Sequence, residues 1–226
     1  MAQKSFTRVF GSLLGLVFFL ALPAIAQNTS PKPADAEMDR VQAMITQAKQ
    51  EAEQFSKSGT KADDANHPNL KWAATFWTYR LKHPGTPATI VATTQALSLL
   101  YRSDRVSEMQ AKADTLKLDD LAWKQLINVV LWASIKTKDY SYLISKAEAL
   151  IQSAVDPEIK ALARFNIGEA YWRRGDTEQA RVAFQTVVAQ YPNTSKGEEA
   201  EGNLREIEFL NVGQPAPNSV ARLTIS

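Results

Sequence analysis

The residues able to do chemistry are few in this chain of 226 residues. Cysteine is absent, so the sequence offers neither a thiol nucleophile nor a thiolate metal ligand. The imidazoles are those of His67 and His83, and a two-histidine metal site would need carboxylates that only the fold could bring beside them. No G-x-S-x-G, H-E-x-x-H or glycine-rich phosphate loop occurs. We therefore expect no enzyme, no cofactor and no metal.

The remaining polar groups favour structural roles. Asp63-Asp64 and Asp119-Asp120 are paired acids, but loop solvation and helix capping explain them better than general acid–base work. His83 stands at the expected end of a helix, where a cation would favour the helix dipole. These residues therefore point to the ends of helices and not to a catalytic centre.

Aromatic side chains could form a ligand groove or a core. They are Trp72, Phe76, Trp77, Trp123 and Trp132. Because they occur at helical spacing, we expect them to be core residues.

The elements that position these residues are clearest at 161–192, which reads ALARFNIGEAYWRRGDTEQARVAFQTVVAQYP. Gly168 and Ala180 are small enough to let two helices cross closely, and the rings of Tyr171 and Phe184 can fill the space beside the crossing. The segment therefore predicts a pair of packed helices.

Start and stop residues frame this pair. Asp156 can cap the first helix, with Pro157 in its first turn. Gly175 can close that helix in a left-handed conformation, Asp176 can start the second helix, and Pro192 ends it. At these offsets the segment resembles one tetratricopeptide repeat, a family pattern of about 34 residues. Such repeats are scaffolds, so the resemblance implies a binding role.

The resemblance places Phe165, Glu169, Trp172 and Arg173 on a peptide-binding groove. These residue types suit a peptide with both apolar and charged character. The carboxylate-clamp variant of the family has Lys where Phe165 stands and Asn where Glu169 stands, so we expect no capture of a free C-terminal carboxylate. Packing of Trp172 against the next helix is an equally open alternative.

The same unit recurs upstream. His83–Thr86 is echoed by Tyr191–Thr194, 108 residues later, which equals three steps of 36. Asp104, Asp139 and Asp176 each stand where a second helix should start. The predicted helices are Glu37–Lys57, Leu70–Lys82, Pro87–Tyr101, Arg105–Leu116, Asp120–Lys136, Tyr140–Gln152, Pro157–Arg174, Thr177–Gln190, and one from Ser195, capped with Glu198, to about Leu210. Because Leu131 occupies the position of the small crossing residue, the upstream units are only tetratricopeptide-like.

The first 26 residues predict a secretory signal peptide. Lys4 and Arg8 form a basic start, Leu13–Leu22 is too short to span a membrane, and Ala24–Ala26 is a cleavage site. An uncleaved anchor is the alternative. Without Lys4 and Arg8 the chain has 24 basic against 24 acidic residues, so we expect no nucleic-acid partner, and no membrane partner after cleavage. The predicted location is the periplasm or the exterior.

The tail breaks the helical pattern. Glu208–Asn218, EFLNVGQPAPN, resembles the join that opens the catalytic domain of TlpA-type redoxins, which are thioredoxin-superfamily disulfide reductases. That family's Cys-x-x-Cys has no counterpart here, so none of its catalytic residues is carried over. The resemblance implies that the chain is the helical part of a redoxin-type protein. We expect Asn218–Ser226 to be poorly ordered, whereas Val212 and Pro215 can pack on the last helix.

The sequence therefore predicts an all-α fold, a right-handed solenoid of tetratricopeptide-like helix pairs with a short irregular tail. The predicted parts are a signal peptide at 1–26, a disordered leader at 27–36, a helical domain at 37–210 and a redoxin-like tail at 211–226. The predicted function is a non-enzymatic interaction or spacer module of the cell envelope. Two alternatives are an independent periplasmic adaptor with a protein or peptide partner, and disulfide reduction by a longer parent protein.

Overall fold

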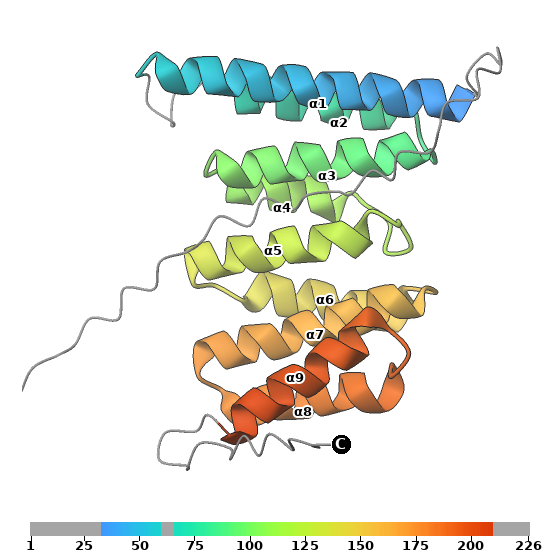
Figure 1. The fold of residues 1–226 in the computed structure, drawn as a ribbon, viewed down its shortest axis with the longest axis vertical. Coiled ribbons are helices and arrows are strands. Elements are labelled where there is room, and N and C mark those ends of the chain that lie inside the picture. The colour runs from blue at the N-terminus through green and yellow to red at the C-terminus, as the bar shows by residue number, and fades with distance from the viewer. Residues whose placement is uncertain (1–32, 60–65, 210–226) are drawn as a thin grey trace, which may run out of the picture. The chain divides into compact units, whose positions relative to one another are not determined.

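The computed structural model describes residues 33–59 and 66–209. In this part the chain forms nine helices and no strand (Figure 1). They are α1 (Pro33–Lys57), α2 (Pro68–Lys82), α3 (Pro87–Arg102), α4 (Val106–Asp114), α5 (Trp123–Thr137), α6 (Ser141–Ser153), α7 (Pro157–Arg174), α8 (Thr177–Gln190) and α9 (Ser195–Phe209). All nine predicted helices are present, which confirms the all-α repeat solenoid.

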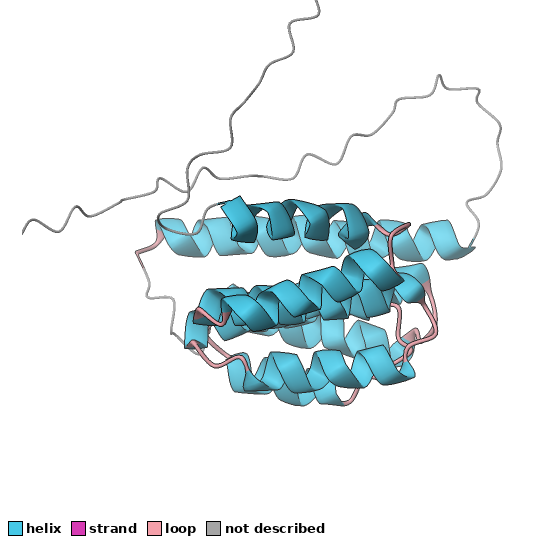
Figure 2. Ribbon diagram, turned by 90° about the horizontal axis from the view of Figure 1, so that it is seen from below, coloured by secondary structure: helices cyan, strands magenta, loops and turns pink. Residues whose placement is uncertain are grey.

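The helices stack in two layers. Each odd-numbered helix packs on the next odd-numbered one, from α1 through α3, α5 and α7 to α9. The even-numbered helices lie behind them in Figure 1 and pack on their chain neighbours, most extensively α2 on α3, α8 on α7 and α6 on α7. Figure 2 shows the same two-layered arrangement from below, with helices joined only by loops in the described part. Every main contact is therefore local along the chain.

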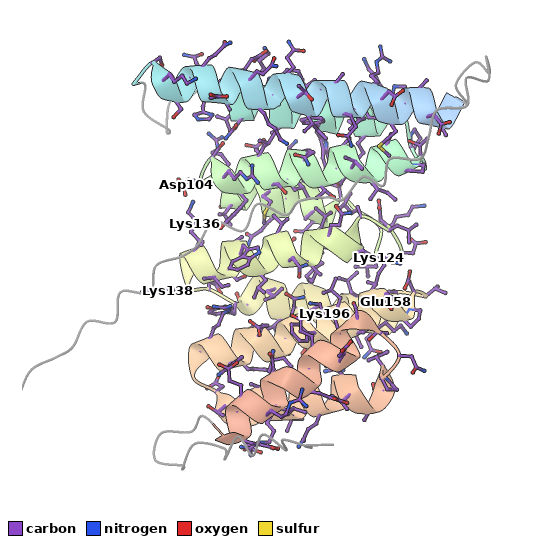
Figure 3. The ribbon with its side chains drawn as sticks, viewed as in Figure 1. Asp104, Lys124, Lys136, Lys138, Glu158 and Lys196 are labelled. Atoms are coloured by element: carbon purple, nitrogen blue, oxygen red, sulfur yellow. The ribbon has the colours of Figure 1, made fainter. Side chains whose placement is uncertain are left out.

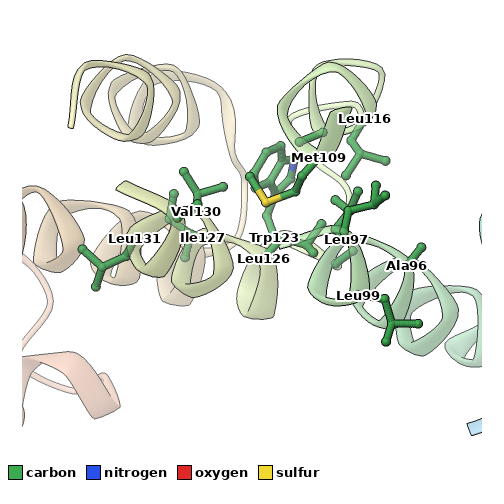
Figure 4. Close-up of a cluster of buried hydrophobic side chains, with 14 of the residues drawn as sticks. Ala96, Leu97, Leu99, Met109, Leu116, Trp123, Leu126, Ile127, Val130 and Leu131 are labelled. Carbon is green, nitrogen blue, oxygen red and sulfur yellow. The ribbon is translucent and has the colours of Figure 1, made fainter. Parts of the chain in front are cut away.

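Two hydrophobic cores lie between the layers. The larger core continues from Val41 in α1 to Ala183 in α8, and Figure 4 shows its centre, with Leu97, Met109 and Trp123 side by side. The smaller core joins α7, α8 and α9. Its buried members are Phe165, Ala180, Phe184, Val187, Ala200 and Ile207. The last helix is thus held by a core of its own.

Left-handed residues set the register of three helix pairs. They are Asp104 after α3, Lys138 after α5 and Gly175 after α7, with φ values of 60°, 58° and 86°. These positions are 34 and 37 residues apart. Gly has no Cβ and adopts this conformation readily, whereas Asp and Lys adopt it at a cost. The sequence therefore shows the turn plainly only at Gly175.

With this register the buried residues of the even helices align. They are Met109 and Ala113 in α4 with Leu116 just after it, Leu143, Ala147 and Leu150 in α6, and Ala180, Phe184 and Val187 in α8. The crossing position of the odd helix is Leu131 in α5 and Gly168 in α7. A Cβ built on Gly168 would lie 2.7 Å from Cε1 of Phe184. The predicted close approach at Gly168 is therefore confirmed.

The two echoed turns have the same geometry. His83 and Tyr191 end their helices with φ near −130° and −134°, and Thr86 and Thr194 begin the next ones. The Oγ1 of Thr86 accepts from the N–H of Thr89, and the Oγ1 of Thr194 accepts from the N–H of Gly197, both at 3.2 Å. The predicted cap of the last helix was therefore wrong by one residue, because Thr194 makes the bond expected of Ser195.

Other boundaries also differ from the prediction. Helix α1 begins at Pro33, so the last four residues of the expected disordered leader are helical, and Pro is well suited to a first turn. Helix α5 begins at Trp123 and not at Asp120, because the carboxylate of Asp120 accepts from the N–H of Ala122 and pairs with Arg80 at 2.7 Å. The signal peptide at 1–26 and the tail at 211–226 lie outside the described residues.

Helix α4 is the shortest of the described helices. It has nine residues, and the chain then turns through 115–122 before α5 begins. Polar side chains contribute to its contact with α6. The hydroxyl of Tyr142 donates to the carbonyl of Gln110 at 3.2 Å and to the carboxylate of Asp114 at 2.9 Å, and the ammonium of Lys146 lies 2.7 Å from the same carboxylate.

Candidate peptide-binding face

Three of the four predicted groove residues lie together at the end of α7. Glu169, Trp172 and Arg173 line a shallow pocket of about 320 Å³. The guanidinium of Arg173 lies 3.2 Å from the carboxylate of Glu169, one helical turn earlier. Spacings of three and four residues bring these side chains to one side of the helix.

Phe165, the fourth predicted residue, lies in the core. Its side chain is 5% exposed, its ring lies 5.3 Å from that of Phe184, and it belongs to the small core beneath α9. The ammonium of Lys196, in the first turn of α9, lies 4.4 Å from the Phe165 ring centroid. Helix α9 therefore covers the position that the repeat pattern leaves open to a ligand.

The sequence also placed Trp132 wrongly. We expected it in the core, but it is 48% exposed. Trp72, Phe76 and Trp123 are buried as expected, and Trp77 is partly buried against the same core. Trp132 lies on α5, and the guanidinium of Arg173 lies 6.0 Å from its ring centroid. Its place in the register, 37 residues before Glu169, is the signal that could have identified it.

Trp172 packs against the next helix, and it also lines the pocket. Its ring meets that of Phe184 edge-on at 6.3 Å, so it packs against α8. It is also half-buried and lines the pocket with Arg173. Packing on Phe184 fixes the ring that the pocket presents.

A chain of polar contacts crosses three odd-numbered helices at this pocket. The amide nitrogen of Asn203 in α9 donates to Glu169 in α7 at 3.0 Å, Glu169 pairs with Arg173, and Arg173 lies over Trp132 of α5. Each group thus has a partner that holds its orientation. We call the surface formed by Trp132, Glu169, Trp172 and Arg173 the tryptophan face.

A second pocket lies at the other end of the same helices. It measures about 340 Å³ and is lined by Lys124, Asn128, Glu158, Leu162, Ser195 and Lys196. In Figure 3 the labelled Lys124, Glu158 and Lys196 come from α5, α7 and α9. Lys124 pairs with Asp156 at 2.7 Å, and this ammonium is the main reason that the pKa of Asp156 lies below its ordinary value.

The histidines have structural roles. Nδ1 of His67 accepts from the N–H of Asn69 and so caps α2. His83 stacks on Tyr79 at 4.3 Å, and its Nδ1 lies 3.1 Å from the carboxylate of Glu37, which ties α1 to α2. No group of three or more His, Cys, Asp or Glu side chains in residues 33–59 and 66–209 could hold a metal ion.

Of the two acidic pairs, the structure describes Asp119-Asp120. Asp120 is engaged by Arg80 and by the N–H of Ala122, and Asp119 is exposed. Asp63 and Asp64 lie outside the described residues. None of the described helices is both long enough and apolar enough to cross a membrane.

The comparison with known protein families supports the repeat. A family model described as a tetratricopeptide repeat matches residues 162–194. No curated protein and no solved structure matches the chain. Repeats of this type usually mediate protein–protein interaction and are seldom catalytic. The segment that contains Glu169, Trp172 and Arg173 is therefore similar to a tetratricopeptide repeat, within an all-α repeat solenoid.

Proposed function

We propose that this protein is a non-catalytic interaction module that binds a peptide segment of another protein on the tryptophan face. One observation supports this most strongly. Trp132 is 48% exposed beside a pocket lined by three residues that the repeat pattern assigns to a groove. A large half-exposed ring beside an oriented guanidinium is the kind of site that concentrates binding energy in protein interfaces.

The peptide-binding role can be tested without knowing the natural partner. A random peptide library displayed on phage would be selected on the purified protein, and the recovered peptides measured by calorimetry. We expect Trp132→Ala to raise Kd by about 10-fold or more. Val182→Ala is the matched control, since Val182 is 51% exposed on α8, away from the tryptophan face.

Two outcomes would contradict the proposal. Selection could recover no peptide with measurable affinity, or the recovered peptides could bind the Trp132→Ala protein as tightly as the parent. Circular dichroism of both variants shows whether the fold is intact.

We further propose that the protein works in the cell envelope as the helical part of a TlpA-type redoxin. The basic start, short apolar run and Ala24–Ala26 support export, and Val212-Gly213 with Ala216-Pro217 supports the redoxin parentage. An independent periplasmic adaptor is the second candidate. Intact mass of the exported protein tests the export, with Gln27 expected as the first residue. Sequencing downstream tests the parentage, since an adaptor would have no in-frame Cys-x-x-Cys.

A further inference from the structure

The tryptophan face differs from the other large apolar side chains that are exposed in the described part of the chain. Leu81, Leu121, Val155 and Val182 are exposed, but each is a flexible or small aliphatic group. Trp132 offers a flat ring, and Arg173 beside it is held by Glu169 and by the ring itself. The face therefore combines an apolar plane with an oriented set of N–H donors.

Most charges around this face are already balanced, with the exception of Lys138, which directly follows α5, is exposed and has no carboxylate partner among the described residues. Four cations lie in or near the two pockets described above, and each of them has a carboxylate partner. The pairs are Arg173–Glu169, Lys124–Asp156, Lys196–Glu199 and Lys136–Asp104. Figure 3 shows Lys136 and Asp104 together between α3 and α5. An acidic ligand would have to compete with these carboxylates, and a basic ligand would meet the lysines and Arg173.

A neutral ligand avoids both costs. The guanidinium has five N–H donors, of which Glu169 occupies only part, so Arg173 can still donate to an uncharged carbonyl oxygen. A tryptophan ring suits a flat apolar group such as a proline ring. Proline-containing segments are already extended before binding, so they lose little entropy when they bind to an aromatic surface.

We propose that the tryptophan face binds a neutral, proline-containing extended segment of a partner protein. A proline ring packs on Trp132, and a backbone carbonyl of the segment accepts a hydrogen bond from Arg173. This inference rests on the proposed peptide-binding function and specifies the chemical class of the peptide.

Three capped peptides of equal length test which chemical class of peptide binds to the tryptophan face. The first alternates Pro with Ala and Leu and has no charge, the second replaces Ala with Glu, and the third replaces Ala with Lys. Calorimetry would be done on the full chain at low and high salt. We expect the neutral peptide to bind at least about 10-fold tighter than either charged one. Its Kd should change less than about twofold with salt, because it makes no ion pair.

Two variants locate the site. Trp132→Ala removes the ring and should weaken the neutral peptide by about 10-fold. Arg173→Lys keeps the charge but loses the planar set of donors, so it should also weaken binding. Val182→Ala should leave Kd unchanged. Tight binding of the neutral peptide that both site variants leave intact would overturn the assignment to this face.

The outcomes separate this inference from the proposed function. If library peptides bind but the preferred ones are charged and strongly salt-dependent, the function stands and the inference fails. If no peptide binds, both fail. The chain also contains a Pro-x-Pro of its own at Pro215 and Pro217. A rise in affinity of threefold or more, about 0.6 kcal/mol, on Pro215→Ala with Pro217→Ala would assign the face to this segment and overturn the external partner.

Discussion

The α5–α6 and α7–α8 pairs fill the same helix crossing in opposite ways. In α7–α8 the odd helix contributes Gly168 and the even helix contributes Phe184, whose ring lies where a Cβ of Gly168 would stand. At the aligned positions of α5–α6 the odd helix has Leu131 and the even helix has Ala147, both buried. The larger of the two aligned residues is thus on the odd helix in α5–α6 and on the even helix in α7–α8.

This difference shows what a repeat pattern recognises. The tetratricopeptide model matches 162–194, which contains the Gly168–Phe184 arrangement, and it does not extend to α5–α6. Both pairs nevertheless form the same supersecondary unit in one solenoid. A packed interior requires a filled volume, and several combinations of side chains satisfy that requirement. Leu131 is therefore a different solution at this position and not a defect of the repeat.

The largest expected effect comes from breaking the α7–α8 crossing. Phe184→Ala should lower the free energy of unfolding by about 3–5 kcal/mol, since it removes a fully buried ring. Gly168→Leu should cost about 1–3 kcal/mol or more, since its side chain meets the ring. The double variant recreates the Leu and Ala arrangement of α5–α6, so its loss should be smaller than the sum of the two. Urea denaturation measures all three.

Val182→Ala is the control for this series, because the side chain is exposed on the same helix and should change stability by less than about 0.5 kcal/mol. If the two losses of stability simply add in the double variant, Leu and Ala do not compensate each other at this crossing.

A middle-sized effect concerns the ends of the helices. Thr86→Ala and Thr194→Ala each remove a side-chain cap, so each should lower the free energy of unfolding by about 1 kcal/mol. Ser195→Ala should have a much smaller effect, since Ser195 already lies inside α9. Thermal denaturation of the three variants decides between the caps. If Ser195→Ala lost more stability than Thr194→Ala, the cap would be Ser195, as expected from the sequence.

The smallest effect is a pH dependence that distinguishes α7 from α5. Asp156 caps α7 by accepting from the N–H of Glu158 at 2.9 Å, whereas Ala122, the N-cap residue of α5, makes no side-chain cap. The Lys124 ammonium holds the pKa of Asp156 below its ordinary value. A depressed carboxyl pKa stabilises the fold above the unfolded pKa, and this stability is lost as pH falls through the folded pKa.

Urea denaturation of the parent and of Asp156→Asn, from pH 7 down to about pH 3, tests this dependence. We expect the parent to be more stable by less than about 1 kcal/mol at pH 7, with the difference becoming smaller toward the acid end. A difference that stays constant across this range would mean that the ion pair adds nothing beyond the hydrogen bond, which Asn can also make.

The sequence predicted the helices well because their signals are local. Gly175, the caps and the helical spacing of apolar residues each act within a few neighbours along the chain. The echo of His83–Thr86 in Tyr191–Thr194 also correctly indicated two equivalent turns. Asp104 and Lys138 adopt the same left-handed conformation as Gly175, but their residue types do not indicate it.

The candidate site was harder to predict because it depends on neighbours that are distant in sequence. Phe165 belongs to the predicted groove by position, but α9 brings Lys196 over its ring. Trp132 has the spacing of a core residue, yet it is 48% exposed, and its ring contact is with Arg173 of α7. Glu169 is oriented by Asn203, which follows it by 34 residues. Helical periodicity indicates the side of the helix on which a residue lies. It does not indicate which other element packs over that side.

The short α4 has a consequence for how the stack shares its stability. Between the first four helices and the last five, α3 packs on α5, Met109 of α4 lies beside Trp123 of α5 in the larger core, and Tyr142 and Lys146 of α6 make polar contacts with α4. In a linear array each interface couples the folding of its two sides. Salt weakens the Lys146–Asp114 pair, so rising ionic strength should loosen the cooperativity between the two blocks. Calorimetry would then record a broader melting transition at high salt than at low salt.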